Sequence, residues 1–232
     1  MKADHYDRFA GSYSLDNESN LINGYYERPA MIGLAGDVNG RRVLDAGCGS
    51  GPLAAALRER GAIVTGFDSS PAMIELAARR LGTDARLLVA DLGKPLPFPG
   101  SAFDDVVGSL VLHYFEDWTA PLSELRRVLR PGGRLLLSVH HPMIYPAVNP
   151  GADYFALTQW TDQYFFEDQP VELTFWHRPL HAMTDAFSNA GFRLSVISEP
   201  AVSPATPREL LPQQLAERRS FLCFIFFVLQ AQ

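Results

Sequence analysis

Three features are scarce in this 232-residue sequence. It has only two cysteines, Cys48 and Cys223, so we do not expect a disulfide framework. The 20 lysines and arginines are outnumbered by 26 acidic residues and form no basic run, which argues against a nucleic-acid partner because such partners usually meet a basic face. The longest strongly apolar run, residues 221–229, is too short to cross a bilayer, so no membrane partner is expected.

The N-terminal residues MKADHYDRF lack the apolar core of a signal peptide, and we therefore expect a cytoplasmic protein. The length suits one α/β domain with an elaboration, so we predict a single domain over residues 1–232. No metal site is predicted. Because the net charge is −6, a neutral or cationic small molecule is the natural partner. A monomer and a homodimer both stay open.

The run VLDAGCGSG at residues 43–51 predicts a strand followed by a glycine turn. Gly47, Gly49 and Gly51 alternate with small residues, and Pro52 then opens a helical-looking stretch. Glycine is needed where the backbone takes a positive φ or where a ligand approaches closely, and proline fits the first turn of a helix. Because a helix that follows such a loop points free N–H groups toward a ligand, the run predicts a binding site.

The spacing of the glycines distinguishes two kinds of cofactor site. The dinucleotide fingerprint G-x-G-x-x-G would need a third glycine at position 52, where Pro52 stands, so a nicotinamide oxidoreductase is the weaker interpretation. The pattern D-x-G-x-G-x-G of residues 45–51 resembles motif I of the class I S-adenosylmethionine-dependent methyltransferases, particularly their ubiquinone-biosynthesis-like, small-molecule branch. The loop carries no basic residue, as suits a cofactor without a pyrophosphate. The resemblance implies that S-adenosylmethionine, which leaves as S-adenosylhomocysteine, contacts Asp45, Gly47, Cys48, Gly49 and Gly51.

Two further acidic residues follow predicted strands at residues 62–67 and 86–90. Asp68 lies about twenty positions beyond the glycine loop, where a carboxylate can accept hydrogen bonds from two ribose hydroxyls. Asp91, followed by Leu92, matches the family position at which a carboxylate receives the adenine amino group while a backbone N–H contacts a ring nitrogen. The remaining predicted cofactor contacts are Tyr13, Ser69, Met73 and Ser109.

The segment from Tyr6 to Tyr13 resembles a Y-D-x-x-A-x-x-Y element that folds over the cofactor in this family. Its aromatic residues recur three and four apart, which predicts one face of an amphipathic helix. A helix that merely packs on the domain is the alternative interpretation. Residues 1–38 are predicted as an N-terminal helical cap.

The resemblance also implies an α/β, Rossmann-like fold. We expect a seven-stranded, mostly parallel sheet of order 3-2-1-4-5-7-6, with strand 7 antiparallel and helices on both faces. Besides the strands already given, strands are predicted at residues 103–109, 134–139, 192–198 and 221–229. Helices are predicted at residues 24–35, 53–60, 72–81, 120–129, 179–190 and, as a short helix, 208–219.

Nine aromatic residues gather between residues 141 and 178, which is too apolar for an idle loop. Related enzymes often place a substrate-covering lid here, and an aromatic wall suits a flat or apolar small molecule. An extra hairpin packed on the domain, or a dimer face, is the alternative interpretation. Strand-like alternation is present at residues 171–176.

Three histidines are candidates for a general base: His113, in a Leu-His-Tyr element after the fourth strand, and His140 and His141 after the fifth. A histidine near its ordinary pKa suits proton transfer at neutral pH, and we favour His113 with one of the pair helping. The N/D-P-P-Y/F element typical of methyltransferases that act on nucleic-acid amines is replaced by Ser-Leu-Val-Leu at residues 109–112.

The leading hypothesis is therefore an enzyme that transfers a methyl group from S-adenosylmethionine to a small-molecule hydroxyl, amine or activated carbon by in-line displacement. The alternative is a protein of this fold that does not methylate. It would be a cofactor-retaining binding or regulatory module, or an enzyme that uses the sulfonium as a fixed positive charge.

Overall fold

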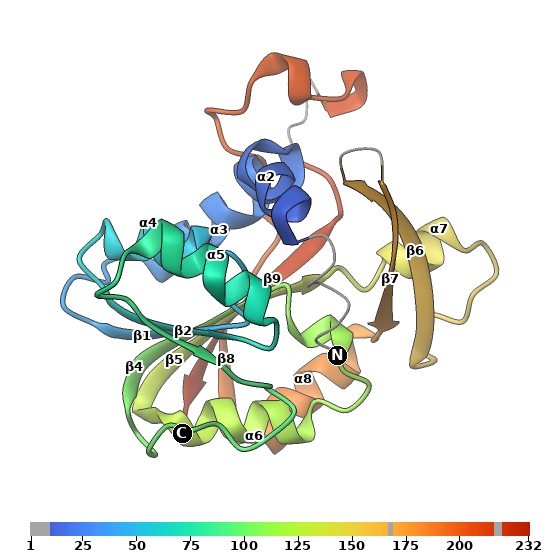
Figure 1. Cartoon of the computed structure of the whole chain (residues 1–232). Coiled ribbons are helices and arrows are strands. Elements are labelled where there is room, and N and C mark those ends of the chain that lie inside the picture. Colours follow the sequence, from blue (N-terminus) through green and yellow to red (C-terminus); the bar gives the residue numbers. More distant parts are fainter. Residues whose placement is uncertain (1–9, 167–168, 216–219) are drawn as a thin grey trace.

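The computed structural model describes residues 10–166, 169–215 and 220–232. In this part of the chain a seven-stranded sheet of order β3-β2-β1-β4-β5-β9-β8 lies between two layers of helices (Figure 1). All neighbouring strands are parallel except β9, which runs antiparallel to both β5 and β8. The predicted order is therefore confirmed, with β8 and β9 as the sixth and seventh strands. The strands of this sheet are β1 (Arg42–Ala46), β2 (Ile63–Asp68), β3 (Arg86–Val89), β4 (Phe103–Ser109), β5 (Leu129–His140), β8 (Phe192–Ser198) and β9 (Phe224–Ala231).

Helices cover both faces of the sheet (Figure 1). Residues of α3 and α4 pack in the core cluster on one face, and residues of α6 and α8 pack in the cluster on the other. No helix among the described residues is both long and apolar enough to cross a membrane. The helices are α2 (Ala10–Ser19), α3 (Arg28–Ala35), α4 (Pro52–Arg58), α5 (Pro71–Leu81), α6 (Thr119–Val128), α7 (Ile144–Val148) and α8 (Leu180–Asn189).

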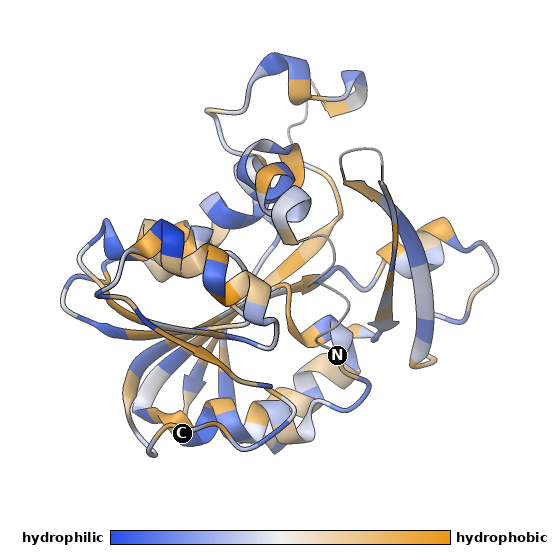
Figure 2. Ribbon diagram, in the orientation of Figure 1, coloured by the Kyte–Doolittle hydropathy of each residue, from blue (hydrophilic) through white to orange (hydrophobic). Residues whose placement is uncertain are grey.

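Strand β9 shows why the sheet needs cover on both sides. Six consecutive apolar residues, Phe224 to Leu229, are all buried, and they colour the strand as hydrophobic (Figure 2). Successive side chains point to opposite faces, so Phe226 joins one core cluster while Phe227 joins the other. An all-apolar run such as residues 224–229 therefore indicates a strand in the interior of the sheet.

Local signals set the ends of α5, the helix that follows β2. Ser70 is its N-cap and accepts a hydrogen bond from the N–H of Met73 at 3.1 Å, while Pro71 occupies the first turn. Gly82 ends the helix with a φ of 85°, a conformation that glycine adopts without steric cost. These caps hold the start of α5 beside the end of β2.

Three predicted elements differ from the structure. The predicted helix 24–35 begins as a π-helical turn, η1 (Asn23–Glu27), before α3 continues it. The fifth strand is longer than predicted because β5 begins before its proline–glycine turn, with an irregular register against β4. The predicted helix 208–219 was wrong in its described part, where only two 3₁₀ turns occur, η3 (Arg208–Leu210) and η4 (Gln213–Leu215), since Pro212 interrupts helical hydrogen bonding. Tyr6 and the start of the predicted N-terminal helix lie outside the described residues.

The aromatic-rich insertion forms a hairpin separate from the main sheet (Figure 1). Strands β6 (Thr158–Phe166) and β7 (Gln169–His177) pair antiparallel along their whole length. One face carries Trp160, Tyr164 and Phe175, which pack in a third apolar cluster together with Met73 of α5. The hairpin thus packs against the domain through its aromatic face.

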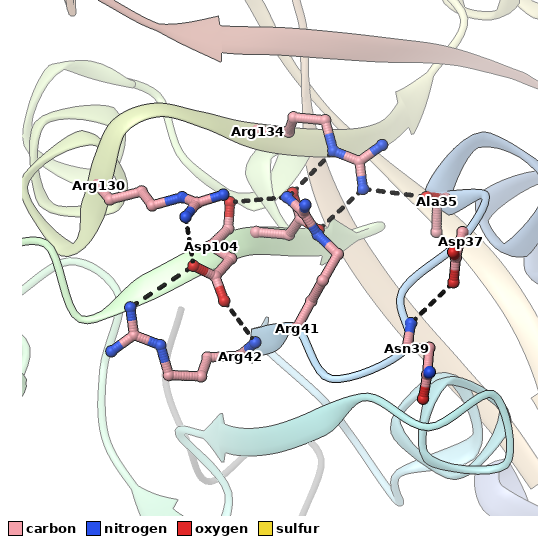
Figure 3. A network of polar contacts seen from close by, with 9 residues as sticks. Ala35, Asp37, Asn39, Arg41, Arg42, Asp104, Arg130 and Arg134 are labelled. Atoms are coloured by element: carbon pink, nitrogen blue, oxygen red, sulfur yellow. Dashed lines mark hydrogen bonds and ion pairs between the residues drawn. The ribbon is translucent and has the colours of Figure 1, made fainter.

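The end of the sheet opposite the glycine loop is held by a network of ion pairs (Figure 3). Asp105 of β4 is 1% exposed and takes two hydrogen bonds from the guanidinium of Arg41 and two, each of 2.8 Å, from that of Arg134. Beside it, Asp104 accepts the backbone N–H of Arg42 at 2.8 Å and lies 3.2 Å from the guanidinium of Arg130. The network joins β1, β4 and β5.

Burial by itself would raise the pKa of Asp105, but the hydrogen bonds and charges of Arg134 and Arg41 bring that pKa below its usual range. A carboxyl group whose pKa is lower in the folded state stabilises the protein above its unfolded pKa, and the stabilisation is lost as the pH falls through the folded pKa. We therefore expect Asp105 to contribute fully at neutral pH and to lose its contribution below about pH 4.

Asp105→Asn should lower the free energy of unfolding by about 3–5 kcal/mol at pH 7, because it leaves two arginines around a site without a charge. Urea denaturation at pH 7 measures this loss, and repeating it toward pH 3 should show the wild-type and variant curves converging. Asp84→Asn is the matched control, since Asp84 pairs with Arg58 at the surface and should change stability by less than about 1 kcal/mol. Equal losses in the two variants would contradict the assignment.

Candidate functional site

The glycine loop joins the carboxyl ends of β1 and β2. The N–H groups of Gly47 and Cys48 both donate to the carbonyl oxygen of Phe67, each at 2.9 Å. Gly47 and Gly49 have φ values of 75° and 53°, which side chains rarely allow. A Cβ on Gly47 would lie 2.8 Å from Cγ2 of Val111, whereas one on Gly49 would meet no atom within 4 Å. Gly47 is thus required by packing, and Gly49 faces open space.

Asp68 ends β2 and turns its carboxylate toward this loop. The N–H of Gly49 donates to Oδ2 and the N–H of Ser70 donates to Oδ1, each at 2.9 Å. A carboxylate offers about four acceptor positions, so one such group can serve several donors. The side chain is 8% exposed and lines a cavity at this edge of the sheet.

Asp45, near the end of β1, lines the same cavity but has no such partners. It is 1% exposed, and neither carboxylate oxygen accepts a hydrogen bond of normal geometry from the described residues. Burial, followed by the carboxylates of Glu27 and Asp68, raises the pKa of Asp45 to about 8, and only the backbone of Ala54 acts in the opposite direction. A buried carboxyl group in this state favours a cationic ligand.

The cavity has a volume of about 260 Å³ and lies where the carboxyl ends of β1, β2 and β4 meet the aromatic hairpin. Helix α2, the η1 turn and the hairpin residues Tyr164, Phe166, Leu173 and Phe175 complete its wall. Ten of the residues predicted from the sequence line it, namely Tyr13, Asp45, Gly47, Cys48, Gly49, Asp68, Met73, Ser109, His113 and His140.

Five predicted site residues lie elsewhere: Gly51, Ser69, Asp91, Leu92 and His141. Asp91 turns back on its own loop, where Oδ1 accepts the N–H of Gly93 at 2.9 Å. Leu92 is 4% exposed and belongs to the core beneath the sheet. His141 lies 2.7 Å from Glu199 through Nε2, outside the cavity.

The two cavity histidines form a buried stack. The rings of His113 and His140 lie 4.0 Å apart between centroids with an angle of 8° between their planes, and the ring of Phe175 lies 4.5 Å from that of His140. Burial lowers the pKa of His140 to about 4, and burial followed by the neighbouring His140 brings the pKa of His113 well below its usual value. The sequence-based expectation of histidines near their ordinary pKa is therefore wrong, because the aromatic wall excludes the water that would solvate a charged ring.

Glu27, Arg28 and Leu110 are among the cavity residues that the sequence interpretation did not identify. Glu27 and Arg28 follow an aromatic pair in a helical stretch, and periodicity alone gave no sign that both are drawn inward. Leu110 has a φ of 51°, which is unusual for a branched side chain and tends to occur at functional sites. The π-helical turn that carries Glu27 is also a known mark of such sites, but it is invisible in the sequence.

Comparison with known proteins finds relatives that are methyltransferases. A family model described as "Methyltransferase domain" matches residues 44–137. Malonyl-[acyl-carrier protein] O-methyltransferase of Serratia marcescens is 39% identical over 136 residues, which make up 59% of this chain and 51% of that enzyme. Ubiquinone biosynthesis O-methyltransferase of Xanthomonas euvesicatoria is 32% identical over 172 residues, or 70% of this chain and 66% of that enzyme.

A solved structure shares the fold over nearly the whole chain. The S-adenosylmethionine dependent methyltransferase of Mesorhizobium loti superposes with a TM-score of 0.66 at 26% identity, covering 87% of this chain and 96% of that one. The chain spans only about half the length of the Serratia relative. The family match coincides with β1 through β5, which carry the glycine loop, Asp45 and Asp68. Residues 44–137 therefore match the methyltransferase-domain family, and the similar structure from Mesorhizobium loti is an S-adenosylmethionine-dependent methyltransferase.

Proposed function

We propose that the protein transfers the methyl group of S-adenosylmethionine to a small-molecule acceptor. One observation carries the proposal: the glycine loop, Asp45 and Asp68 meet in a single cavity at the carboxyl edge of the sheet, where ligands bind in open α/β folds. The bound cofactor supplies a methyl group already activated by a sulfonium. The protein then has mainly to align the two reactants and exclude water.

The residues present fit this cofactor. The unpartnered carboxylate of Asp45 would hold the cofactor's ammonium group, and Asp68 would hold the ribose hydroxyls. The open space over Gly49 admits the ligand close to the backbone. Arg28, whose guanidinium lies at 2.7 Å and 2.9 Å from two oxygens of Asn17, would provide the cation for the amino-acid carboxylate.

The aromatic hairpin suits the acceptor side of the site. Tyr164, Phe166 and Phe175 line the cavity from β6 and β7, so residues 141–178 would act as a cover over an aromatic or apolar acceptor. One relative is a malonyl-[acyl-carrier protein] O-methyltransferase and another is an O-methyltransferase of ubiquinone biosynthesis, and both transfer methyl groups. A single domain over residues 1–232, a cytoplasmic location and a monomeric or homodimeric state stay predictions.

The stacked histidines would position the acceptor rather than serve as strong bases. At neutral pH both rings are uncharged, since the pKa of His140 is about 4 and that of His113 lies well below its usual value. A neutral imidazole still offers one donor and one acceptor. His113 stays the favoured contact because it follows β4 and faces the cavity.

S-adenosylhomocysteine should bind the wild-type protein, and Asp68→Ala should weaken that binding about tenfold or more through loss of charge-assisted hydrogen bonds. Isothermal titration calorimetry measures both affinities, with NAD as the competing ligand. Glu59→Gln, at an exposed position on the far end of α4, is the control and should bind normally. Absence of S-adenosylhomocysteine binding to the wild type, or tighter binding of NAD, would overturn the proposed function.

Ligand binding should also release a proton from Asp45. Because its pKa is about 8, the carboxyl group is mostly protonated at pH 6.5. A bound ammonium group would stabilise the ionised form. Calorimetry at pH 6.5 in buffers of different ionisation enthalpy should therefore show net proton release with wild type and less with Asp45→Asn. Equal release by both proteins would rule out this role.

His113→Ala should reduce turnover at least about tenfold while S-adenosylhomocysteine affinity changes less than threefold. Turnover is measured as S-adenosylhomocysteine formation with a panel of small aromatic amines, phenols and quinols. His181→Ala is the matched control, since this histidine is exposed at the start of α8. Unchanged turnover combined with weakened cofactor binding would exclude the acceptor-side role.

A further inference from the structure

Glu27 is a buried carboxylate that the proposed cofactor contacts leave unused. It ends the π-helical turn η1, is 4% exposed and lines the cavity. Its Oε1 accepts hydrogen bonds from the hydroxyls of Ser109, at 2.7 Å, and Ser138, at 2.6 Å. These two serines lie side by side on β4 and β5, so Glu27 spans the two strands at the inner wall of the cavity.

Both serine hydroxyls donate to Oε1, and no hydrogen bond or ion pair to the second oxygen, Oε2, is found within the part of the chain that the structure describes. The guanidinium of the next residue, Arg28, is turned to the oxygens of Asn17 and lies 4.0 Å from the carboxylate of Glu18. A carboxylate so deeply buried is costly unless a donor or cation meets it, so a ligand group is the natural partner for Oε2.

Position separates Glu27 from the glycine loop and Asp68, although its carboxylate also acts on the pKa of Asp45. Ser138 and His140 are two residues apart on β5 and point to the same face. The centroid of the His140 ring lies 4.5 Å from that of Phe175 in the hairpin and 5.8 Å from that of Phe224 in β9. Glu27 therefore lies at the β4–β5 side of the cavity, toward the aromatic wall, while the glycine loop and Asp68 lie at the β1–β2 side.

The charges around the cavity favour a cationic group at this position. Arg28 is its only lining arginine or lysine among the described residues, against the acidic residues Asp16, Glu27, Asp45 and Asp68. Aromatic faces of the hairpin attract cations, whereas a deprotonated hydroxyl would be an anion beside two buried carboxylates. A protonated amine is the acceptor group that satisfies Oε2, the aromatic wall and the negative charge together.

We propose that Glu27 binds the protonated amino group of the acceptor and removes one proton from it, so that the acceptor is an amine carrying an aromatic or apolar group. This inference rests on the proposed function. In the step, one N–H bond breaks, the proton passes to Oε2 of Glu27, and the electron pair stays on nitrogen as the nucleophile.

The raised pKa of Glu27 supports this role. Burial raises the pKa of Glu27 above its usual value, while the hydrogen bonds from Ser138 and Ser109 and the charge of Arg28 oppose the rise. A carboxylate with a raised pKa is a stronger base than an ordinary one. The other titratable groups that line the cavity come from α2, the start of α3, β1, the glycine loop, β2, the turn after β4, β5 and β6. Among the described residues that line the cavity these groups are Tyr13, Asp16, Asp45, Cys48, Asp68, His113, Tyr114, His140 and Tyr164, besides Arg28.

The test uses the full chain saturated with S-adenosylhomocysteine and two probes of equal size, 2-phenylethylamine and neutral 2-phenylethanol. Calorimetry or ligand-observed NMR should show about a tenfold preference of the wild type for the amine at pH 7.5, lost in Glu27→Gln. S-adenosylhomocysteine affinity should stay within threefold. Glu59→Gln, which removes one surface charge, should keep the preference.

The outcomes separate the two proposals. If S-adenosylhomocysteine does not bind the wild type, the proposed function fails. If it binds but the probes bind equally, or neither probe binds, or Glu27→Gln keeps the preference, only the role of Glu27 is overturned.

A second variant keeps the test decisive if Glu27→Gln does not fold. The amine preference of the wild type should increase as the pH rises through the pKa of Glu27. Ser138→Ala should move this increase to higher pH, because it removes a hydrogen bond that lowers the pKa. A profile that does not move would contradict the proposal.

Discussion

Buried carboxyl groups at one end of the sheet are the constraint on which the rest of the site depends. Glu27, Asp45 and Asp68 are each less than 10% exposed, yet only Arg28 brings a positive charge to the same cavity among the described residues. Such carboxylates cost folding free energy, and a domain has only about 5–15 kcal/mol of net stability. Under the proposed function, cationic groups of the cofactor and the acceptor would meet Asp45 and Glu27, and hydroxyl groups would meet Asp68.

The opposite end of the same strands shows the contrasting solution. Asp105 is just as buried as Asp45, but two arginines saturate its oxygens, and its pKa falls below the usual range whereas that of Asp45 rises to about 8. Both residues come from neighbouring parallel strands, β1 and β4. At one end of the sheet the buried carboxylate is paired with arginines, and at the other end it lines the cavity without such partners. Leu110, with its strained φ of 51°, lies at the cavity end.

Much of the fold could be predicted because its signals are local. The glycine loop, the caps of α5 and the apolar run of β9 each depend on a few consecutive residues, and the strand order followed from a family resemblance carried by such motifs. Prediction failed where the conformation or protonation of a residue depends on segments distant in the sequence. The π-helical turn before α3 depends on tertiary packing of Tyr26 against β9, and the protonation of His113 and His140 depends on an aromatic wall from the hairpin.

The sequence by itself determined the glycine loop and the acidic strand end at Asp68, since spacing along the chain is enough to place residues at strand ends, and the family resemblance of these motifs implied the Rossmann-like sheet. Only the tertiary structure decided which polar groups share one cavity. Glu27 and Ser138 are 111 positions apart in sequence, yet Oε1 of Glu27 lies 2.6 Å from Oγ of Ser138. Asp91 and His141, predicted for the same site, bond to Gly93 and Glu199 instead. Burial and charge pairing are properties of the packed molecule, and no local pattern encodes them.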